Sequence, residues 1–528
     1  MKTMKRFAAI AAATVMSVST VVATASFSAF AADTNTITVE QAKQNHTYTA
    51  YQIFKGTYAG GKLTGVAWGT GFDSTKASNF VADLKSTFSD ATKYAKIAAL
   101  TDNSSAEDVA DALSDIASNS DLKVNADADK LAAIIAKYLG TGVAADTKGV
   151  ISVDSDGYYM VTDSLNADAS SENESISRHM LAVMGANTTV SLKQSTPTVT
   201  KKVRDVDDGR TSEWQDSADY AIGDDISFQL TGTLPADYSS YDNYYYEFSD
   251  TFSKGLTFDE NSINVTADGK ALTKGTDYTV TLDDKAYTFK VVISDLKKAN
   301  ANLTSDSKIV VDYTGTLNAD AVIGSAGNPN EVKLIYSNNP NKNADGTPSD
   351  SKGETPKDKV IVFTYELDVN KVDQNQKPLT GAKFALYKRV YNATTSNYDE
   401  TLVAKFDTDT ENMSKFVFKG IDAGMYRLEE IEAPQGFNKI ADVIFTITAD
   451  HEDESNDPKL ISLNATSNSA TFGASADTGI IDTTVINKEG TSLPTTGSIG
   501  TKIFYGTGAT IALGAGVLLI AKKRAKKD

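Results

Sequence analysis

The C-terminal end of the chain limits where the rest of it can fold. Residues 503–521 form an apolar run of about 20 residues, enough to cross a ~30 Å hydrocarbon core as a helix. The run is followed by basic residues that favour the cytoplasmic side of a membrane, namely Lys522, Lys523, Arg524, Lys526 and Lys527. We therefore predict a C-terminal transmembrane helix with a basic tail.

The N-terminal end has the composition of an export signal. Lys2, Lys5 and Arg6 precede an apolar stretch over residues 7–22, and small residues follow it up to Ala29-Phe30-Ala31. A positive start, an apolar core and an A-x-A site are typical of a secretory signal peptide. We predict that residues 1–31 are removed and that the mature chain begins outside the cell near Ala32.

The pentapeptide Leu493-Pro494-Thr495-Thr496-Gly497 stands just before the apolar run. This LPxTG sequence, the apolar span and the basic stop together resemble the cell-wall sorting signal of Gram-positive surface proteins. The resemblance implies that a sortase cleaves between Thr496 and Gly497 and transfers Thr496 to an amine. It also implies an extracellular, wall-anchored protein whose sorting segment is removed.

Composition excludes several function classes. The net charge of -18 over 528 residues leaves no basic footprint for nucleic acid. Cysteine is absent, so disulfides cannot reinforce the exported part. The three histidines, His46, His179 and His451, lie far apart, which argues against a histidine-based catalytic or metal site. We find no enzyme signature and predict no cofactor and no metal.

The length suits about three domains at ~150 residues each. Residues 32–195 mix strand patterns, as in Tyr48–Phe54, 157–161 and 188–192, with helical periodicity in 75–99, 105–118 and 126–139. Residues 196–365 and 366–490 carry short alternating runs separated by Asn, Asp, Gly and Pro, which favour β-sandwiches. The predicted fold is therefore mainly β, with tandem immunoglobulin-like sandwiches, helical insertions in the first domain, and a sorting segment over 491–528.

The third domain carries a specific motif. It opens with Lys371 in Val-Asn-Lys-Val-Asp, contains the stretch 424–437 (Gly-Met-Tyr-Arg-Leu-Glu-Glu-Ile-Glu-Ala-Pro-Gln-Gly-Phe), and closes with Asn487. This closely resembles the collagen-adhesin B-type domain. The resemblance implies an intramolecular isopeptide bond between Lys371 and Asn487, with Glu430 as catalyst. Strand alternation places Lys371 and Glu430 on apolar faces, where burial would favour a neutral amine and a protonated acid.

The second domain offers a similar set with an aspartate. The stretches around residues 246–256 and 332–341 are similar to the fimbrial isopeptide-forming domain of major pilins. On strand phase we pair Lys201 with Asn338 and assign Asp250 as catalyst. A one-residue bulge would select Lys202 or Asn339 instead. The alternative for Lys201 and Lys371 is that both reach solvent beside ordinary polar neighbours.

Major pilins also carry an acceptor lysine near the end of the first domain, in a motif like V-x-V-Y-P-K. This chain has Thr-Val-Ser-Leu-Lys over residues 189–193, so the resemblance makes Lys193 the candidate acceptor. Ser191-Leu192 replaces the Tyr-Pro of the motif. A solvated interdomain lysine is the competing interpretation.

Our leading hypothesis is the shaft subunit of a covalent, sortase-assembled pilus. Its implied partners are sortase, other copies of the chain, peptidoglycan, tip and basal pilins, and host surface ligands. A monomeric wall-anchored adhesin that binds host matrix or glycan is the main alternative. An extracellular hydrolase would need paired carboxylates in a cleft, whereas the acidic residues suit a solvated surface.

Overall fold

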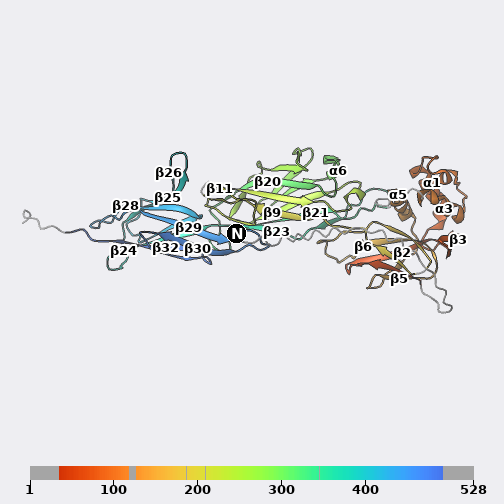
Figure 1. Cartoon of the computed structure of the whole chain (residues 1–528), viewed down its shortest axis with the longest axis horizontal. Coiled ribbons are helices and arrows are strands. Elements are labelled where there is room, and N and C mark those ends of the chain that lie inside the picture. Colours follow the sequence, from red (N-terminus) through yellow and green to blue (C-terminus); the bar gives the residue numbers. More distant parts are fainter. Residues whose placement is uncertain (1–34, 118–125, 186, 208–209, 344, 492–528) are drawn as a thin grey trace, which may run out of the picture.

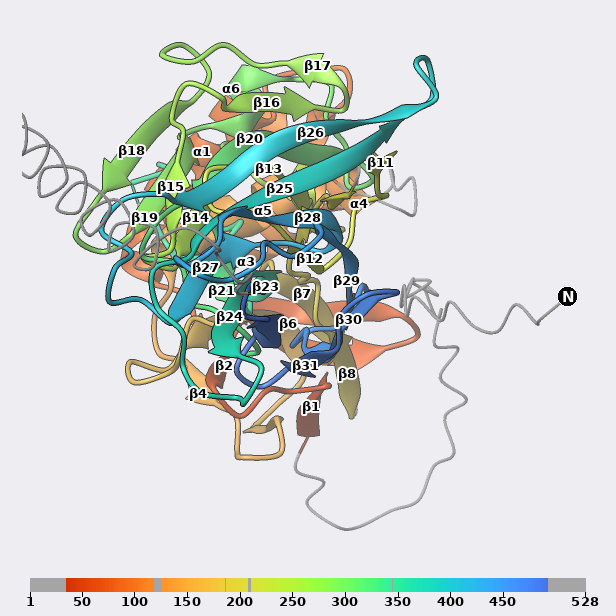
Figure 2. The same cartoon turned by 90° about the vertical axis from the view of Figure 1, so that its left-hand side faces the viewer.

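The computed structural model describes residues 35–117, 126–185, 187–207, 210–343 and 345–491. Over these residues it is mainly β and is drawn out along one axis, with three successive regions arranged end to end (Figure 1). The view along that axis shows the regions one behind another (Figure 2). The prediction of tandem mainly-β sandwiches with helices in the first is confirmed.

The first region combines two sheets with a helical layer. Its sheet orders are β5-β1-β8 and β3-β2-β6-β7, with β4 on β2. The strands are β1 (Asn35–Glu40), β2 (His46–Ala59), β3 (Lys62–Trp68), β4 (Val143–Ala144), β5 (Val150–Val153), β6 (Gly157–Leu165), β7 (Met180–Met184) and β8 (Thr188–Ser191). One small core lies between the sheets, and a second core packs the helices on Phe54 and Met160.

The helices of the first region are shorter than their periodicity predicted. They are α1 (Ala77–Thr87), α2 (Ala95–Ala99), α3 (Ala106–Ala112), α4 (Ser114–Ala117) and α5 (Ala126–Ile135), with 3₁₀ turns η1 (Ser74–Lys76) and η2 (Ala136–Tyr138). The α3 helix starts at a capping box in which Ser105 and Asp108 exchange side-chain and backbone hydrogen bonds. Phe80, Leu84 and Ile97 point into the core.

The second region is a two-sheet sandwich. Its sheet orders are β12-β23-β21-β14-β19-β18, with β22 on β21, and β17-β16-β20-β13-β9, with β15 on β20. Its elements are β9 (Val199–Val203), β10 (Val206–Asp207), β11 (Arg210–Thr211), β12 (Ser217–Asp219), β13 (Asp225–Thr233), η3 (Tyr238–Ser240), β14 (Tyr246–Phe252), β15 (Leu256–Phe258), β16 (Asn264–Ala267), β17 (Lys270–Ala271), β18 (Thr279–Asp283), β19 (Thr288–Ile293), α6 (Leu296–Ala299), β20 (Lys308–Leu317), β21 (Asn328–Ser337), β22 (Lys352–Glu354) and β23 (Asp358–Phe363). Strict burial alternation along β20 and β21 turns every second side chain into the core.

The third region is a second sandwich, with sheet orders β27-β24-β32-β31 and β26-β25-β28-β29-β30. Its strands are β24 (Tyr365–Asp373), β25 (Lys383–Asn392), β26 (Asn397–Phe406), β27 (Lys415–Ile421), β28 (Gly424–Glu432), β29 (Val443–His451), β30 (Leu460–Ser467), β31 (Phe472–Ser475) and β32 (Ile480–Asn487). The first and last strands, β24 and β32, pair in parallel.

Backbone hydrogen bonds join neighbouring regions. Between the first two, Asn173 N donates to Glu354 O at 2.6 Å and Ile176 N donates to Asn338 O at 2.7 Å. Between the last two, the backbone approaches so closely that a Cβ on Gly324 would lie 2.5 Å from the carbonyl carbon of Thr478. Gly324 also has φ +86°, which favours glycine. The junctions are therefore packed contacts rather than open linkers.

The first region contains a buried ion cluster near its junction with the second region. His46 Nδ1 is 2.6 Å from Asp163 Oδ1, His46 Nε2 is 3.1 Å from Glu174 Oε2, and Lys43 Nζ also contacts Glu174. Burial by itself lowers the pKa of His46, but the hydrogen bonds and charges of Asp163 and Glu174 outweigh it and raise the pKa overall. The cluster ties β2 and β6 to the segment that reaches the second region.

We predict that His46→Gln destabilises the first region by about 2–3 kcal/mol at pH 5.5, through loss of charged hydrogen bonds. Since the pKa of His46 is raised on folding, this stabilisation is complete below its ordinary value of 6.5 and disappears as pH rises through the folded-state value. Thermal unfolding of both proteins at pH 5.5 and 8.5 should show the larger difference at pH 5.5. An equal or larger difference at pH 8.5 would contradict this role.

Candidate functional site

A lysine is enclosed in the core of the second region. Lys201 on β9 is 0% exposed, and its Nζ donates to the Asp250 carboxylate and, at 2.5 Å, to the Tyr313 hydroxyl. The rings of Phe228 and Tyr313 lie 5.3 and 5.0 Å from Nζ. By contrast, Lys202 is part-exposed and forms an ion pair with Asp216 at 2.6 Å. Lys201 is therefore the lysine that faces the interior.

The asparagine at this cluster is Asn330 on β21. Its Nδ2 donates to the Tyr313 hydroxyl at 2.7 Å, and its Oδ1 is buried without a hydrogen-bond partner among the described residues. The antiparallel register places Asp250 opposite Val332 and Phe252 opposite Asn330. Lys201, Asp250, Tyr313 and Asn330 thus form one continuous buried group.

The structure does not bring Asn338 to Lys201, as the predicted pairing would require. Asn338 lies eight residues beyond Asn330, which is roughly 26 Å along a strand. It sits instead at the first junction, where its carbonyl accepts from Ile176 N. Positions 330 and 338 share a strand face, so strand phase alone could not separate them. The neighbouring alternative Asn339 lies at the same distant end.

Burial sets the protonation preferences of the cluster. Desolvation lowers the pKa of the Lys201 amine, although the charge and hydrogen bond of Asp250 oppose this. Desolvation likewise raises the pKa of Asp250 against the opposing effect of Lys201. Both shifts favour a neutral amine beside a neutral acid, which is the form in which an amine is nucleophilic.

The third region holds the predicted lysine, acid and asparagine together. Lys371 on β24 is 1% exposed, and its Nζ donates to the carbonyl oxygens of Val372 and Val485 at 3.1 and 3.3 Å. Asn487 Nδ2 donates to Glu430 Oε1 and Oε2 at 2.9 and 3.1 Å. In the parallel register Lys371 faces Val485, two residues before Asn487, so the two side chains are diagonal neighbours.

Both reacting groups in the third region are poorly solvated. Burial lowers the pKa of the Lys371 amine to about 8, against the attraction of Glu430 and Asp373. Asn487 Oδ1 is buried and lacks a hydrogen-bond partner within the described part of the chain. Glu430 is held in place by Ile440 N, which donates to its Oε2 at 2.9 Å.

Lys193 follows β8 at the junction of the first two regions. Its backbone N donates to Ser177 Oγ at 2.8 Å, and its carbonyl accepts from Arg178 N at 3.3 Å. Burial first, and then the charge of Arg178, lower the pKa of its amine, while Asp129 opposes them. The residue as a whole is exposed, so its side chain is accessible from outside the junction.

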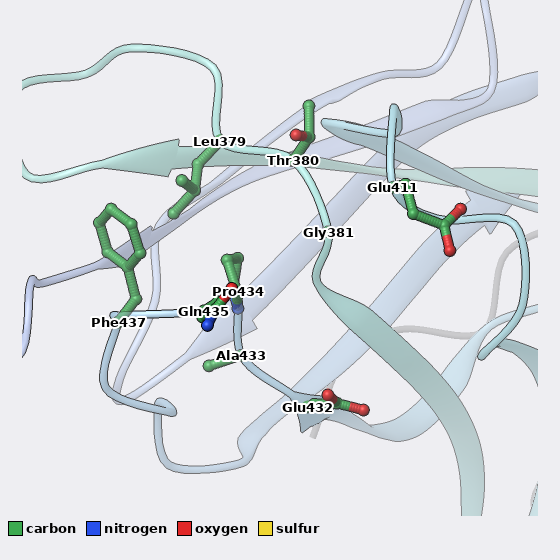
Figure 3. Close-up of a pocket in the computed structure, with 9 residues that line it drawn as sticks. All are labelled: Leu379, Thr380, Gly381, Glu411, Glu432, Ala433, Pro434, Gln435 and Phe437. Atoms are coloured by element: carbon green, nitrogen blue, oxygen red, sulfur yellow. The ribbon is translucent and has the colours of Figure 1, made fainter.

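A surface pocket lies beyond Glu430, at the end of the third region. Its lining comes from the Ala-Pro-Gln-Gly-Phe segment and the facing loops (Figure 3), namely Leu379, Thr380, Gly381, Glu411, Glu432, Ala433, Pro434, Gln435 and Phe437. Glu432 Oε2 forms an ion pair with Lys383 Nζ at 2.7 Å. Phe437 also bridges to Glu489, so the pocket borders the segment that leads toward the sorting signal.

The signal peptide (1–31), the LPxTG residues Leu493–Gly497 and the predicted transmembrane helix lie outside the described residues. Within the described ranges, no helix is both long and apolar enough to cross a membrane.

Three family models match parts of the chain. Residues 222–340 match the Gram-positive pilin backbone subunit 2, Cna-B-like domain, and residues 365–459 match a prealbumin-like fold domain. Residues 486–528 match the LPXTG cell wall anchor motif.

The chain is also similar to known surface and fimbrial proteins. The chain is 28% identical over 404 residues to the trypsin-resistant surface T6 protein of Streptococcus pyogenes serotype M6, covering 63% of this chain and 70% of that protein. It is 29% identical over 190 residues to fimbrial subunit type 2 of Actinomyces naeslundii, covering 34% of each. The solved T6 backbone pilin of serotype M6 S. pyogenes superposes with a TM-score of 0.52 at 18% identity, covering 88% of this chain and all of that one, and so shares the fold. The chain therefore contains a domain of the Gram-positive pilin backbone type and an LPXTG anchor motif, is homologous to the T6 protein, and is an extracellular, cell-wall-anchored protein.

Proposed function

We propose that this chain is the shaft subunit of a pilus in which sortase joins Thr496 of one copy to Lys193 of the next. The observation that carries the proposal is the pair of buried lysine–acid–asparagine groups in two successive sandwiches. The domain boundaries are placed near residues 195, 365 and 490. The chain acts as a sortase substrate and not as an enzyme on external substrates.

The arrangement of the regions suits a filament. Lys193 lies between β8 of the first region and β9 of the second, and residue 491 follows β32, the last strand of the third. A bond from the end of one copy to the junction of another is a heterologous contact that does not close on itself, so it propagates. Tip pilins, basal pilins and host ligands would bind such a shaft as further partners.

The geometry of the third region supports isopeptide formation there by the following steps. The neutral Lys371 Nζ attacks Cγ of Asn487, a new C–N bond forms, and the amide nitrogen leaves as ammonia. Glu430, hydrogen-bonded to that amide nitrogen, takes the proton lost by the amine and returns it to the leaving group. Enclosure in the core supplies the proximity.

The same reaction in the second region joins Lys201 to Asn330. Asp250 is the proton carrier, since it touches Lys201 Nζ and accepts from the Tyr313 hydroxyl at 3.2 Å. Tyr313 also holds the Asn330 amide in place. Each bond would close a loop of more than a hundred residues, which is worth ~4–5 kcal/mol in a chain-entropy model.

A monomeric wall-anchored adhesin is the weaker candidate. The matched relatives and family models are those of pilin backbones and fimbrial subunits. An extracellular hydrolase has still less support. Glu432, a carboxylate that lines the pocket, forms an ion pair with Lys383 and so is not a free catalytic acid or base.

We expect the intact mass of the mature chain to be about 34 Da below the translated mass, because each bond releases one ammonia of about 17 Da. Asn330→Ala should show the loss of one ammonia only. Asn338→Ala is the matched control and should keep both losses. If Asn338→Ala removes a loss and Asn330→Ala does not, the register-based pairing fails.

Glu430→Gln should leave Lys371 and Asn487 unjoined, so that the variant loses one ammonia fewer than the wild type. Without the bond, the free energy of unfolding of the third region should be ~4–5 kcal/mol lower. Glu429→Gln is the control, because Glu429 is the next residue on β28 and lies on the outer face, paired with Arg427 at 3.0 Å. Complete bond formation in Glu430→Gln would remove Glu430 from the mechanism.

Lys193→Arg keeps the positive charge but removes the acceptor amine, so it should abolish the ladder of SDS-resistant, high-mass species in cell-wall extracts. Lys202→Arg, at a part-exposed lysine of the second region, should leave the ladder unchanged. A normal ladder from Lys193→Arg would assign the acceptor to another residue. A wild-type chain that forms no ladder would favour the monomeric adhesin.

A further inference from the structure

The junction of the second and third regions contains a group of ligand-type side chains that plays no part in the chemistry above. Asp205 follows β9, Asp219 ends β12 and His451 ends β29. One carboxylate oxygen from each aspartate and a ring nitrogen of His451 all lie within 4.8 Å of one another. Asp219 is 4% exposed, and the side chains of His451 and Asp205 are 8% and 15% exposed.

Hydrogen bonds fix which nitrogen of His451 faces the group. Ser217 Oγ donates its proton to the carbonyl of Glu452 at 2.7 Å, so toward His451 Nδ1, 2.8 Å away, it can only accept. Asp453 Oδ1, 3.3 Å from the same nitrogen, is a second acceptor. Nδ1 therefore carries a proton, and Nε2 is the ring nitrogen that faces Asp205 and is available to a metal ion. This arrangement of a second acceptor behind the ring is typical of metal-binding histidines.

The distance between Nε2 and the facing carboxylate suits two ligands of one ion. His451 Nε2 is 3.6 Å from Asp205 Oδ2, which is too long for a hydrogen bond. Ligand bonds of 2.0–2.2 Å in a tetrahedral site put neighbouring ligand atoms about 3.4 Å apart. Ala423 N, at 2.7 Å from Asp219 Oδ2, orients the other carboxylate.

The group also leaves buried polar atoms without partners. Asp205 Oδ1 and the hydroxyl of Tyr365, a fully buried residue, have no hydrogen-bond partner among the described residues. The Tyr365 hydroxyl lies in the field of Asp219, Asp205 and Asp422. The nearby cation, Lys388, is bound to Asp422. A positive charge with open coordination positions would satisfy these atoms.

We propose that Asp205, Asp219 and His451 bind one divalent transition-metal cation of the zinc class, which fastens the second region to the third. One imidazole nitrogen and two carboxylates suit Zn²⁺ or Mn²⁺ better than the all-oxygen sites of Ca²⁺. Water or the Tyr365 hydroxyl would complete the shell. Because the ligands come from both sides of the junction, the ion would stabilise one relative orientation of the two regions. The site is independent of the isopeptide bonds and of Lys193.

The test uses the mature chain, purified without a histidine tag and stripped of metal with a chelator. Titration with Zn²⁺ alone, and with Mn²⁺ alone in a second arm, should show saturable binding of one ion per chain and a raised melting temperature. Visible spectra with Co²⁺ should show the intense bands of tetrahedral coordination. His451→Ala and Asp205→Asn should each weaken binding at least tenfold.

Asp450→Asn is the matched control, because Asp450 is exposed and adjacent to His451 on β29, and it should bind like the wild type. The melting temperature without metal and the number of ammonia losses show whether each variant is folded. If His451→Ala does not fold, the affinity of Asp205→Asn, which changes a more exposed residue, tests the proposal instead. Absence of one-to-one binding, or unchanged affinity in a folded ligand variant, would overturn the proposal.

Discussion

Desolvation of two lysine side chains is the constraint on which the second and third regions depend. A charged amine in an apolar core is costly unless it is paired or loses its proton. In the second region Lys201 meets Asp250 and Tyr313. In the third, Lys371 donates to two backbone carbonyls and to no other described residue, while Glu430 accepts from Asn487. Covalent closure would remove the cost altogether, since an amide carries no charge and needs no counterion.

Local sequence predicted the elements whose side chains alternate between core and solvent. β20 and β21 are examples, and so is the motif strand β28, which carries Glu430. β26 was not predicted, because nearly all of its side chains are exposed and it carries no apolar alternation. The helical run 75–99 was predicted as one unit but divides into α1 and α2. The predicted helical run 105–118 begins at Ser105, which the structure shows to be the N-cap of α3.

Long-range register was harder to obtain. The pairing of Lys371 with Asn487 could be predicted because the two residues lie on the first and last strands of a single domain. The second region offered several asparagines on one face of β21, and only the pairing with β14 identifies Asn330. Tyr313 carried no motif at all. The same limit applies to His451, whose neighbours Asp205 and Asp219 are more than two hundred residues away in sequence, so its surroundings could not be anticipated from composition.

The parallel pairing of β24 with β32 has a mechanical consequence. The chain enters the third region at Tyr365 and leaves near Asn487, at opposite ends of these two strands. Tension along the fibre would therefore shear the ladder, loading its hydrogen bonds together rather than unzipping them singly. With Lys371 bonded to Asn487, the load would pass through the seven residues Tyr365–Lys371 of β24 and then cross to Asn487, so that it bypasses the 115 residues between Lys371 and Asn487. Outside Glu430 and the core that encloses the bond, the intervening loops and exposed strands would be free to diversify in sequence without weakening the fibre.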